Sequence, residues 1–396
     1  MSPKFLLSLA MIFLSSSFTI GQTCTYTSDY YPSRIIPSKS RTPSPLYVAI
    51  VVHIIEQKSQ VQPFLSDRQV INQISALNRD YNLKNNEWSG LPTLIKNTIG
   101  NANIVFYLAR ETPDGLPSSG ITRTTDYDGN NPLEDVFFTN RGGHDPWPGI
   151  HYLNIWVMDF PDSYDGILGF SSSPNDIGLV SDGVVINSRA FGLSPAPFIL
   201  GRSLVHEIGH YLGLLHPWGH LSGECSEDDG IIDTPIQSSG HKGCPPQENM
   251  GCETDDPIYW NFMDYTPDCC MALFTQGQVA VMRHVLQNIR TSLTTYGEQN
   301  FSEELPILSN HTISVYPNPA MDYFSIDWSL MILKEGVFIK SILIYDLSGK
   351  KVTEISVSPA RNRSELCTME LPRGLLTLII EDSEHTAHYA GKLIRL

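Results

Sequence analysis

The stretch that decides the fold is HEIGHYLGLLH at residues 206–216. In a helix, His206 and His210 lie one turn apart on the same face, so both imidazoles can reach one tetrahedral metal ion. Gly213 tolerates the positive φ that ends a helix sharply, and His216 can then return as a third ligand. Three protein nitrogens leave a fourth position open for water, which is the arrangement of a catalytic zinc site. We therefore predict a zinc ion held by these three histidines.

Glu207 follows the first histidine and can lean over the same ion. From there it can take a proton from a zinc-bound water and act as general base and then acid. The alternative is a buried helix with surface histidines. A glycine and a third histidine at fixed offsets make that alternative the weaker one.

The composition bounds the classes of function. The chain has 396 residues, enough for two or three domains, and 41% hydrophobic residues, which is ordinary for a globular protein. Its formal net charge of -16 implies no basic surface and argues against nucleic acid as a partner. The charge suits calcium sites and extracellular solubility.

The N-terminus predicts export. Lys4 begins a positive region, and the apolar run that follows is broken by serines, so residues 1–21 are expected to be a signal peptide and not a membrane anchor. We expect no transmembrane segment in the mature protein. Residues 22–44 are predicted to be a leader or short prosegment. Cys24 could cap the zinc in a latent form, or be an exposed thiol in a tail.

The order of the expected strands and helices predicts an α+β unit with one mixed, twisted sheet and the helix of the histidine motif packed beneath it. His53 lies in the first strand and is expected to be a core or edge residue and not a ligand. The expected edge strand over Gly166–Ser173 could pair with an extended substrate, or have no such role. The expected strands are Tyr47–Ile55, Asn103–Ala109, Gly120–Thr124, Tyr152–Asp159, Val184–Asn187 and the edge strand Gly166–Ser173, and the expected helices are Ser66–Tyr81, Ile199–Leu215 and Thr275–Leu293.

An acidic, cysteine-rich stretch follows His216. Hard carboxylates gathered in one loop would bind calcium, with Asp229 and Asp233 as ligands beside Glu227 and Asp228. The alternative is a solvated acidic loop. Five of the seven cysteines lie between residues 225 and 270. Export makes disulfides the default there, and the absence of C-x-x-C pairs disfavours a structural zinc site.

The motif H-E-x-x-H-x-x-G-x-x-H, with NFMDY at residues 261–265, resembles the metzincin metalloproteases. The resemblance implies a Met-turn in which Met263 forms an apolar floor beneath the zinc site. It also implies that Tyr265 lies near the metal, where it could donate a hydrogen bond to the oxyanion of the tetrahedral intermediate.

Further features resemble the pappalysin branch of metzincins over roughly residues 45–297: Asp-Thr-Pro at 233–235, NFMDYTPDCC at 261–270, and Phe274-Thr275 with Gln278 and Met282-Arg283. This resemblance implies a zinc endopeptidase with the disulfides Cys225–Cys252 and Cys244–Cys270. Cys269 departs from the family pattern and could mispair with Cys244.

The resemblance also implies a role for Asp268, five residues after the Met-turn methionine. In close relatives within that branch, an aspartate at this position lines the primed-side specificity pocket. Its carboxylate would favour Arg or Lys on the primed side of the cut. The alternatives are a calcium ligand and a surface aspartate.

The C-terminal part is expected to be separate. Residues 298–312 form a polar linker, and residues 313–396 show short alternating strands typical of a small β-sandwich. YPNPA at 316–320 and the final GKLI resemble the sorting domain of type IX secretion, which implies the secretion machinery as a partner. The alternative is a generic accessory or sugar-binding sandwich.

Together these features predict a zinc endopeptidase that is secreted, either released or attached to the cell surface, and that binds protein or peptide substrates and also calcium. One rival is a non-catalytic secreted binding or adhesion protein that keeps the zinc. A second is an enzyme that acts on a non-peptide amide or ester.

Overall fold

The structure is a computed structural model, and its chain divides into two compact units, Met1–Glu304 and Leu305–Leu396. The described residues are 44–57, 65–85, 87–127, 133–192, 200–220, 225–244, 246, 250–252 and 258–301 in the first unit, and 314–316, 323–328, 338–346, 349–357, 363–367, 371–383 and 387–395 in the second. The expected signal peptide, Cys24 and most of the expected linker lie outside these residues.

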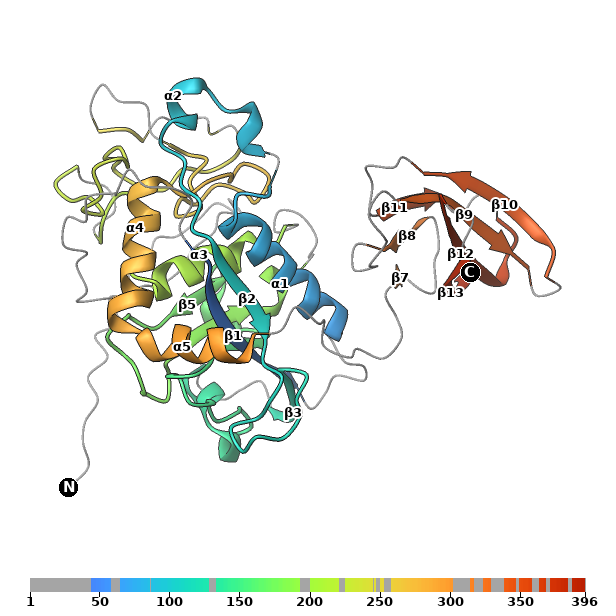
Figure 1. The fold of residues 1–396 in the computed structure, drawn as a ribbon, viewed down its shortest axis with the longest axis horizontal. Coiled ribbons are helices and arrows are strands. Elements are labelled where there is room, and N and C mark those ends of the chain that lie inside the picture. The colour runs from blue at the N-terminus through green and yellow to red at the C-terminus, as the bar shows by residue number, and fades with distance from the viewer. Residues whose placement is uncertain are drawn as a thin grey trace. The chain divides into compact units, whose positions relative to one another are not determined.

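The first unit is built around β1 (Leu46–Gln57), a run rich in β-branched residues. β2 (Ile104–Leu108) pairs in parallel with the first half of β1. β3 (Ile121–Tyr127) pairs in parallel with the second half of β1. On the other side, β4 (Leu153–Met158) pairs in parallel with β1, with Ile50 opposite Leu153. The long β1 strand therefore fixes the register of three neighbours. Figure 1 shows β1 beside β2.

The sheet ends in an antiparallel edge strand. β6 (Gly183–Asn187) pairs in parallel with β4, and β5 (Gly169–Ser171) pairs antiparallel with β6. The strand order is β2-β1-β4-β6-β5, so the sheet is mixed. The edge strand expected over Gly166–Ser173 is thus present but shorter than predicted.

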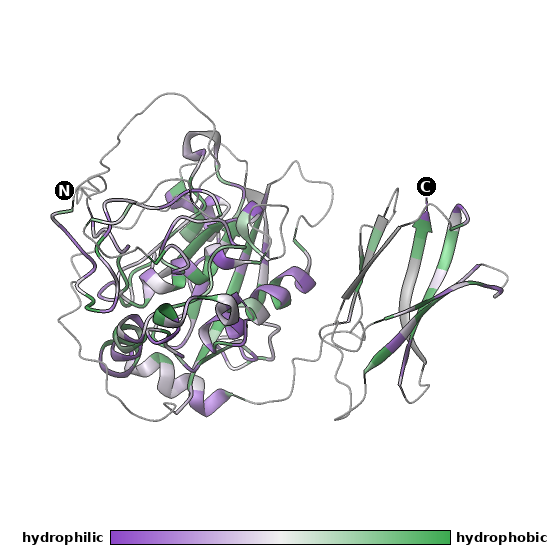
Figure 2. Ribbon diagram, turned by 90° about the horizontal axis from the view of Figure 1, so that it is seen from above, coloured by the Kyte–Doolittle hydropathy of each residue, from purple (hydrophilic) through white to green (hydrophobic). Residues whose placement is uncertain are grey.

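Alternate residues of β1 enter different hydrophobic clusters. Val48, Ile50, Val52 and Ile54 join the cluster that also contains apolar residues of the helices α1 (Asp67–Tyr81) and α3 (Arg202–Tyr211). The residues on the opposite face of the strand, among them Ala49, Val51 and Ile55, join other clusters. Figure 2 shows hydrophobic residues along the central strands. The helix that carries the zinc-binding motif therefore rests on the main core.

Polar side chains surround His53 in the interior of the first unit. The side chain is fully buried; its Nδ1 lies 2.8 Å from Thr122 Oγ1 and its Nε2 lies 3.1 Å from Asn154 Oδ1. Its ring stacks on His144 at 4.3 Å. Burial, and then the neighbouring His144, lower the pKa of His53 to about 3. This histidine belongs to the core.

Two helices begin with reciprocal caps. Ser66 accepts from the backbone of Gln69, whose side chain accepts from the Ser66 backbone. Thr275 and Gln278 make the same capping box at the start of α4 (Gln276–His284). Such caps satisfy backbone donors that have no partner within the helix, and they occur where the sequence predicted the two starts.

The single helix predicted over Thr275–Leu293 is wrong. α4 passes into one π-helical turn, Val285–Ile289, and after Arg290 the chain forms α5 (Thr291–Asn300). The Arg290 N–H donates to the carbonyl of Val285, five residues earlier. With this break, the Arg290 guanidinium lies 2.8 Å from Asp182 and 4.0 Å above the ring of Tyr211.

Several short elements were not predicted. They are the helix α2 (Thr93–Lys96) and the 3-10 helices Glu87–Gly90, Leu133–Phe137, Thr139–Arg141, Asp162–Tyr164 and Ser188–Ala190. None exceeds five residues, so none contains enough helical periods to be visible in the hydrophobic pattern.

The second unit consists of two antiparallel sheets that share one hydrophobic cluster, as in a β-sandwich. One sheet has the order β10-β9-β12-β13 and the other β11-β8-β7. The strands are β7 (Ser314–Tyr316), β8 (Tyr323–Asp327), β9 (Ile339–Tyr345), β10 (Lys351–Ser356), β11 (Arg363–Cys367), β12 (Gly374–Asp382) and β13 (Ala387–Arg395). Across the described parts of both units, we find no helix with the length and hydropathy of a membrane span.

The buried His53 generates a prediction for acid stability. Its pKa of about 3 in the fold lies below the value of about 6.5 in an unfolded chain. Its contribution to stability is therefore complete above about pH 6.5 and is lost as the pH falls toward 3, by up to about 1.4 kcal/mol per pH unit. His53→Gln, which cannot titrate, should lack this slope. Urea unfolding of both proteins between about pH 7 and pH 4.5 measures the difference; equal slopes would contradict the assignment.

Candidate active site

The zinc-binding motif depends on how α3 ends. The helix stops at Tyr211, four residues before the predicted end, and Gly213 has φ +88°. The Gly213 N–H donates to the carbonyl of His210, and the Leu214 N–H to that of Gly209. These two bonds form a Schellman motif, in which a residue with positive φ closes the helix. The turn brings His216 back toward the helix. The predicted start at Ile199 lies outside the described residues.

The three histidines meet through their Nε2 atoms. His206 Nε2 lies 3.1 Å from His210 Nε2 and 3.3 Å from His216 Nε2, and the last two are 3.1 Å apart. In the described part of the chain, this is the one group of three or more potential metal-ligating side chains. Tetrahedral zinc with Zn–N bonds of about 2.0–2.1 Å places its nitrogens roughly 3.3–3.4 Å apart. The donor set fits zinc.

Backbone carbonyls orient two of the rings. His206 Nδ1 lies 2.8 Å from the Phe262 carbonyl, and His210 Nδ1 lies 2.8 Å from the Leu214 carbonyl. A carbonyl can only accept, so each Nδ1 carries the proton and each Nε2 presents a lone pair. Burial lowers the pKa of His206 to about 4 and those of His210 and His216 well below 6.5. The imidazoles are thus in the neutral form that binds metals.

Glu207 lies beside the histidines and is almost fully buried. Its Oε2 has no hydrogen-bond partner among the described residues. Burial raises the pKa of its carboxyl well above the usual 4.5, as general-base catalysis near neutral pH requires. A Cβ built on Gly169 of the edge strand β5 would lie 2.8 Å from Glu207 Cγ. Only a glycine lets the strand approach this carboxylate so closely.

The predicted Met-turn lies below α3. A Cβ on Gly209 would come within 2.5 Å of Met263 Sδ, so the sulfur packs directly on the helix backbone between the first two histidines. Tyr265 follows, with its ring centroid 5.0 Å from that of His216 and 5.9 Å from that of His206. The structure therefore brings both residues next to the three histidines predicted to bind zinc.

Comparisons with known proteins agree with this geometry. Residues 140–287 match the peptidase family model described as pregnancy-associated plasma protein-A, the pappalysins. Mature mirolysin of Tannerella forsythia, solved in complex with a cleaved peptide, is 36% identical, with a TM-score of 0.60; the match covers 66% of this chain and 100% of mirolysin. The chain belongs to the pappalysin family. The predicted resemblance is confirmed, and with it the predicted α+β class.

Fungal secreted enzymes also resemble this pappalysin. An extracellular metalloprotease of Arthroderma gypseum is 33% identical over 153 residues, which cover 37% of this chain and 50% of the relative. Extracellular metalloprotease 1 of Coccidioides posadasii is 29% identical over 256 residues, 62% of this chain and 79% of the relative. The chain thus spans about half the length of some curated relatives. Residues 314–394 match the secretion system C-terminal sorting domain.

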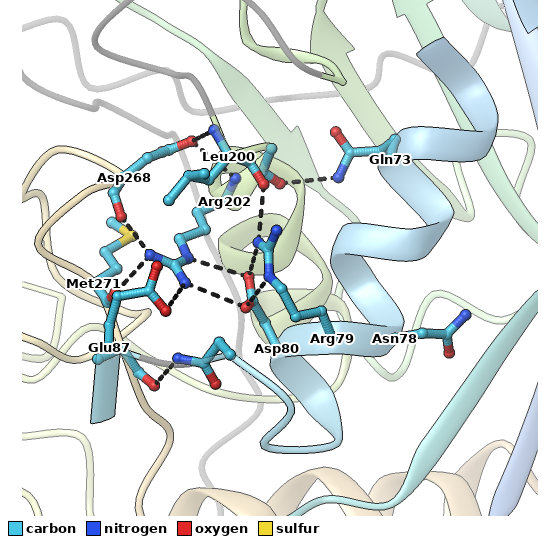
Figure 3. Close-up of polar contacts among 12 residues, drawn as sticks. Gln73, Asn78, Arg79, Asp80, Glu87, Leu200, Arg202, Asp268 and Met271 are labelled. Carbon is cyan, nitrogen blue, oxygen red and sulfur yellow. Dashed lines mark hydrogen bonds and ion pairs between the residues drawn. The ribbon is translucent and has the colours of Figure 1, made fainter. Parts of the chain in front are cut away.

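One functional residue that sequence reasoning missed is Arg202, the first residue of α3. Figure 3 shows its fully buried guanidinium among acceptors from three parts of the pappalysin domain. It donates to both oxygens of Asp80 on α1, at 3.1 and 3.3 Å, and to the carbonyls of Asp268 and Met271, at 2.6 and 2.7 Å. Glu87 Oε2 lies 3.1 Å from the same group. Arg202 therefore ties the zinc-binding helix to α1 and to the segment after the Met-turn.

Asp268 is not the surface aspartate that the sequence left open as an alternative. Its side chain is fully buried, and its Oδ2 accepts from the backbone N–H groups of Leu200 and Arg202. It therefore caps the N-terminus of α3, where Gly201 offers no side chain. Burial raises the pKa of its carboxyl, and the two N–H groups oppose that shift. The pocket role stays a prediction.

The two residues predicted to bind calcium have different environments. Asp229 is buried; its Oδ1 accepts from Ile231 N–H and Thr234 Oγ1, and its Oδ2 has no hydrogen-bond partner among the described residues. Burial raises the pKa of its carboxyl to about 8. Asp233 instead accepts from Thr275 Oγ1 and Gly277 N–H at the start of α4. Asp233 therefore already stabilises a helix end.

Both implied disulfides are present in the structure, Cys225–Cys252 and Cys244–Cys270. Cys269 is a free, exposed thiol beside the second of them. The mispairing of Cys269 with Cys244 that the sequence left open does not occur here. The state of Cys367 lies outside what the structure describes of side chains.

Proposed function

We propose that this pappalysin is a secreted zinc-dependent endopeptidase that hydrolyses peptide bonds. One observation supports this most: three buried, neutral imidazoles converge within 3.3 Å, next to a buried carboxylate with an unpartnered oxygen. A structural zinc site has no use for such a carboxylate. The sorting domain and the extracellular relatives support secretion, with the secretion machinery as a partner and proteins or peptides as substrates.

His206, His210 and His216 would hold the zinc. When bound, the ion supplies a Lewis acid that polarises a peptide carbonyl and makes water a stronger acid. Glu207 takes the proton of the attacking water and passes it to the leaving amine, and its raised pKa suits it to both steps. Tyr265 donates a hydrogen bond to the oxygen on which negative charge develops. The edge strand β5 pairs with the extended substrate backbone.

A digest tests the proposal. The purified exported protein is incubated with a mixed peptide library, with and without a zinc chelator, and the products are identified by mass spectrometry. We expect chelator-sensitive cuts at backbone amides. Glu207→Gln should lower kcat by about 10²–10⁴-fold, since it removes the base, while keeping about one zinc per chain. Full activity in this variant would refute the role of Glu207, and no cuts by the wild type would favour a binding or adhesion protein.

The same digest tests the specificity proposed for Asp268. We expect cuts before Arg or Lys, because a carboxylate at the primed-side pocket pairs with either cation. Asp268→Asn keeps an acceptor for the α3 backbone and removes the charge. It should weaken the preference by about tenfold or more, equivalent to about 1.4 kcal/mol, without lowering the melting temperature by more than a few degrees. Cuts without basic preference in the wild type would remove this role.

We also propose that calcium binds at Asp229, because its buried Oδ2 lacks a partner and hard carboxylate oxygens are calcium ligands. Calcium should raise the melting temperature of the wild type but not of Asp229→Asn. Burial raises the pKa of Asp229 to about 8, so the ion must displace a proton. The stabilisation should therefore grow from about pH 6 to about pH 8. An equal response of the two proteins would exclude Asp229 as a ligand.

A further inference from the structure

Tyr265 is enclosed on the side formed by the cysteine-rich stretch. Its ring lies 4.8 Å from that of Trp218, which stacks on His216 at 4.5 Å with an interplanar angle of 5°. The backbone of Gly240 completes the enclosure. A Cβ built there would lie 2.6 Å from Tyr265 Cδ2 and 2.9 Å from Trp218 Cη2. The Gly240 backbone is therefore in direct contact with both rings.

Space, and not backbone conformation, requires a glycine at this position. Gly240 does not have a positive φ, so an L-residue can adopt its backbone geometry. An added methyl group would have to displace Tyr265 or Trp218, both of which pack against the metal-ligating histidines. The contact can thus be tested by a substitution that introduces no backbone strain.

Asp264, between Met263 and Tyr265, holds the same segment in place. Its carboxylate is fully buried and accepts four hydrogen bonds. Oδ1 accepts from the backbone N–H groups of His241 and Tyr265, at 2.7 and 2.6 Å. Oδ2 accepts from the side chains of Gln237 and His241, at 2.9 and 2.7 Å. Three of these four donors come from residues 237–241, and the fourth is the backbone of Tyr265 itself.

The His241 imidazole links the Asp264 carboxylate to the backbone of Met250. Its Nε2 lies 3.3 Å from the Met250 backbone nitrogen, which can only donate, so Nε2 is the acceptor. Its Nδ1 then carries the proton and donates to Asp264. This arrangement fixes both the tautomer and the orientation of the ring.

The segment of residues 236–244 is anchored at both ends. The Cys252 N–H donates to the Ile236 carbonyl, and Cys252 is itself bonded to Cys225. At the other end Cys244 is bonded to Cys270, six residues beyond Asp264. The segment therefore has little freedom to retreat from Tyr265.

We infer that the 236–244 segment is a positioning device for Tyr265, with Gly240 and His241 as its positioning residues. Gly240 sets the distance of the segment from the phenol ring, and His241 ties the segment through Asp264 to the tyrosine backbone. The device keeps the phenol beside His206 and His216, where the proposed function needs its hydroxyl. This inference rests on that proposed function for its catalytic consequence only; the position of the ring can be measured separately.

Kinetics of full-length variants test the consequence. Gly240→Ala should lower kcat on a library-derived peptide by about 10–100-fold, with KM changed by less than about threefold, because a lost transition-state donor lowers kcat. In a Tyr265→Phe background the same change should have less than about a twofold effect, since the hydroxyl is already absent. Gly90→Ala is the matched control, because its Cβ meets nothing within 4 Å. Equal losses in both backgrounds would overturn the inference.

Rescue and spectroscopy separate positioning from general damage. His241→Asn keeps a donor near Nδ1 and should retain most of kcat, whereas His241→Ala should not. With ¹³C-labelled tyrosine, the ring signal of Tyr265 in the zinc-loaded protein should shift in Gly240→Ala and His241→Ala but not in Gly90→Ala. Unchanged ring signals, or zinc lost from both variants, would refute the inference. If the wild type cleaves no peptide, the proposed function fails, and the ring signals still decide the positioning.

Discussion

The buried guanidinium of Arg202 is the interaction on which the site depends. Arg202 is the first residue of α3, and its guanidinium donates to Asp80 on α1 and to the carbonyls of Asp268 and Met271. A buried charge is costly unless every donor finds an acceptor, and removing one partner of such a pair typically costs about 3–5 kcal/mol. The three segments therefore keep one arrangement, because any displacement would leave a donor or a carboxylate unpaired in the core.

That constraint fixes one end of α3, and the turn at Gly213 fixes the other. Between these ends, helical geometry alone aims His206 and His210 at a common point. The Met-turn contributes the Phe262 carbonyl that orients His206, and Arg202 ties the same region to the helix start through Met271. Backbone carbonyls thus orient two of the three imidazoles. Burial is the largest cause of the neutral state of all three, and the neighbouring histidines lower the pKa of His210 and His216 further.

The sequence predicted those parts of the site that are encoded by neighbouring positions. The three histidines, Glu207 and Gly213 lie within eleven consecutive residues, where helical spacing is sufficient to relate them. The helix starts at Ser66 and Thr275 were predicted in the same way, because each capping residue lies next to the helix that it begins. Contacts between distant residues were not: Arg202 and Asp80 are separated by 122 positions, and no periodicity relates them. The π-helical turn before Arg290 was missed because its cause, the pair with Asp182, is also non-local.

The two sides of the site are stabilised by different physics. The helix that carries the histidines rests on the main hydrophobic core. Tyr265 instead packs against the irregular 236–244 segment, which contributes little apolar surface. Asp264 and two disulfides hold this segment in place. In the entropic model, a disulfide that closes a loop of about 26 residues raises the free energy of unfolding by roughly 3–4 kcal/mol. Here the disulfides supply stability that a hydrophobic core would otherwise provide. Oxidising surroundings outside the cell preserve such bonds, so the geometry around the tyrosine, more than that around the metal, depends on export.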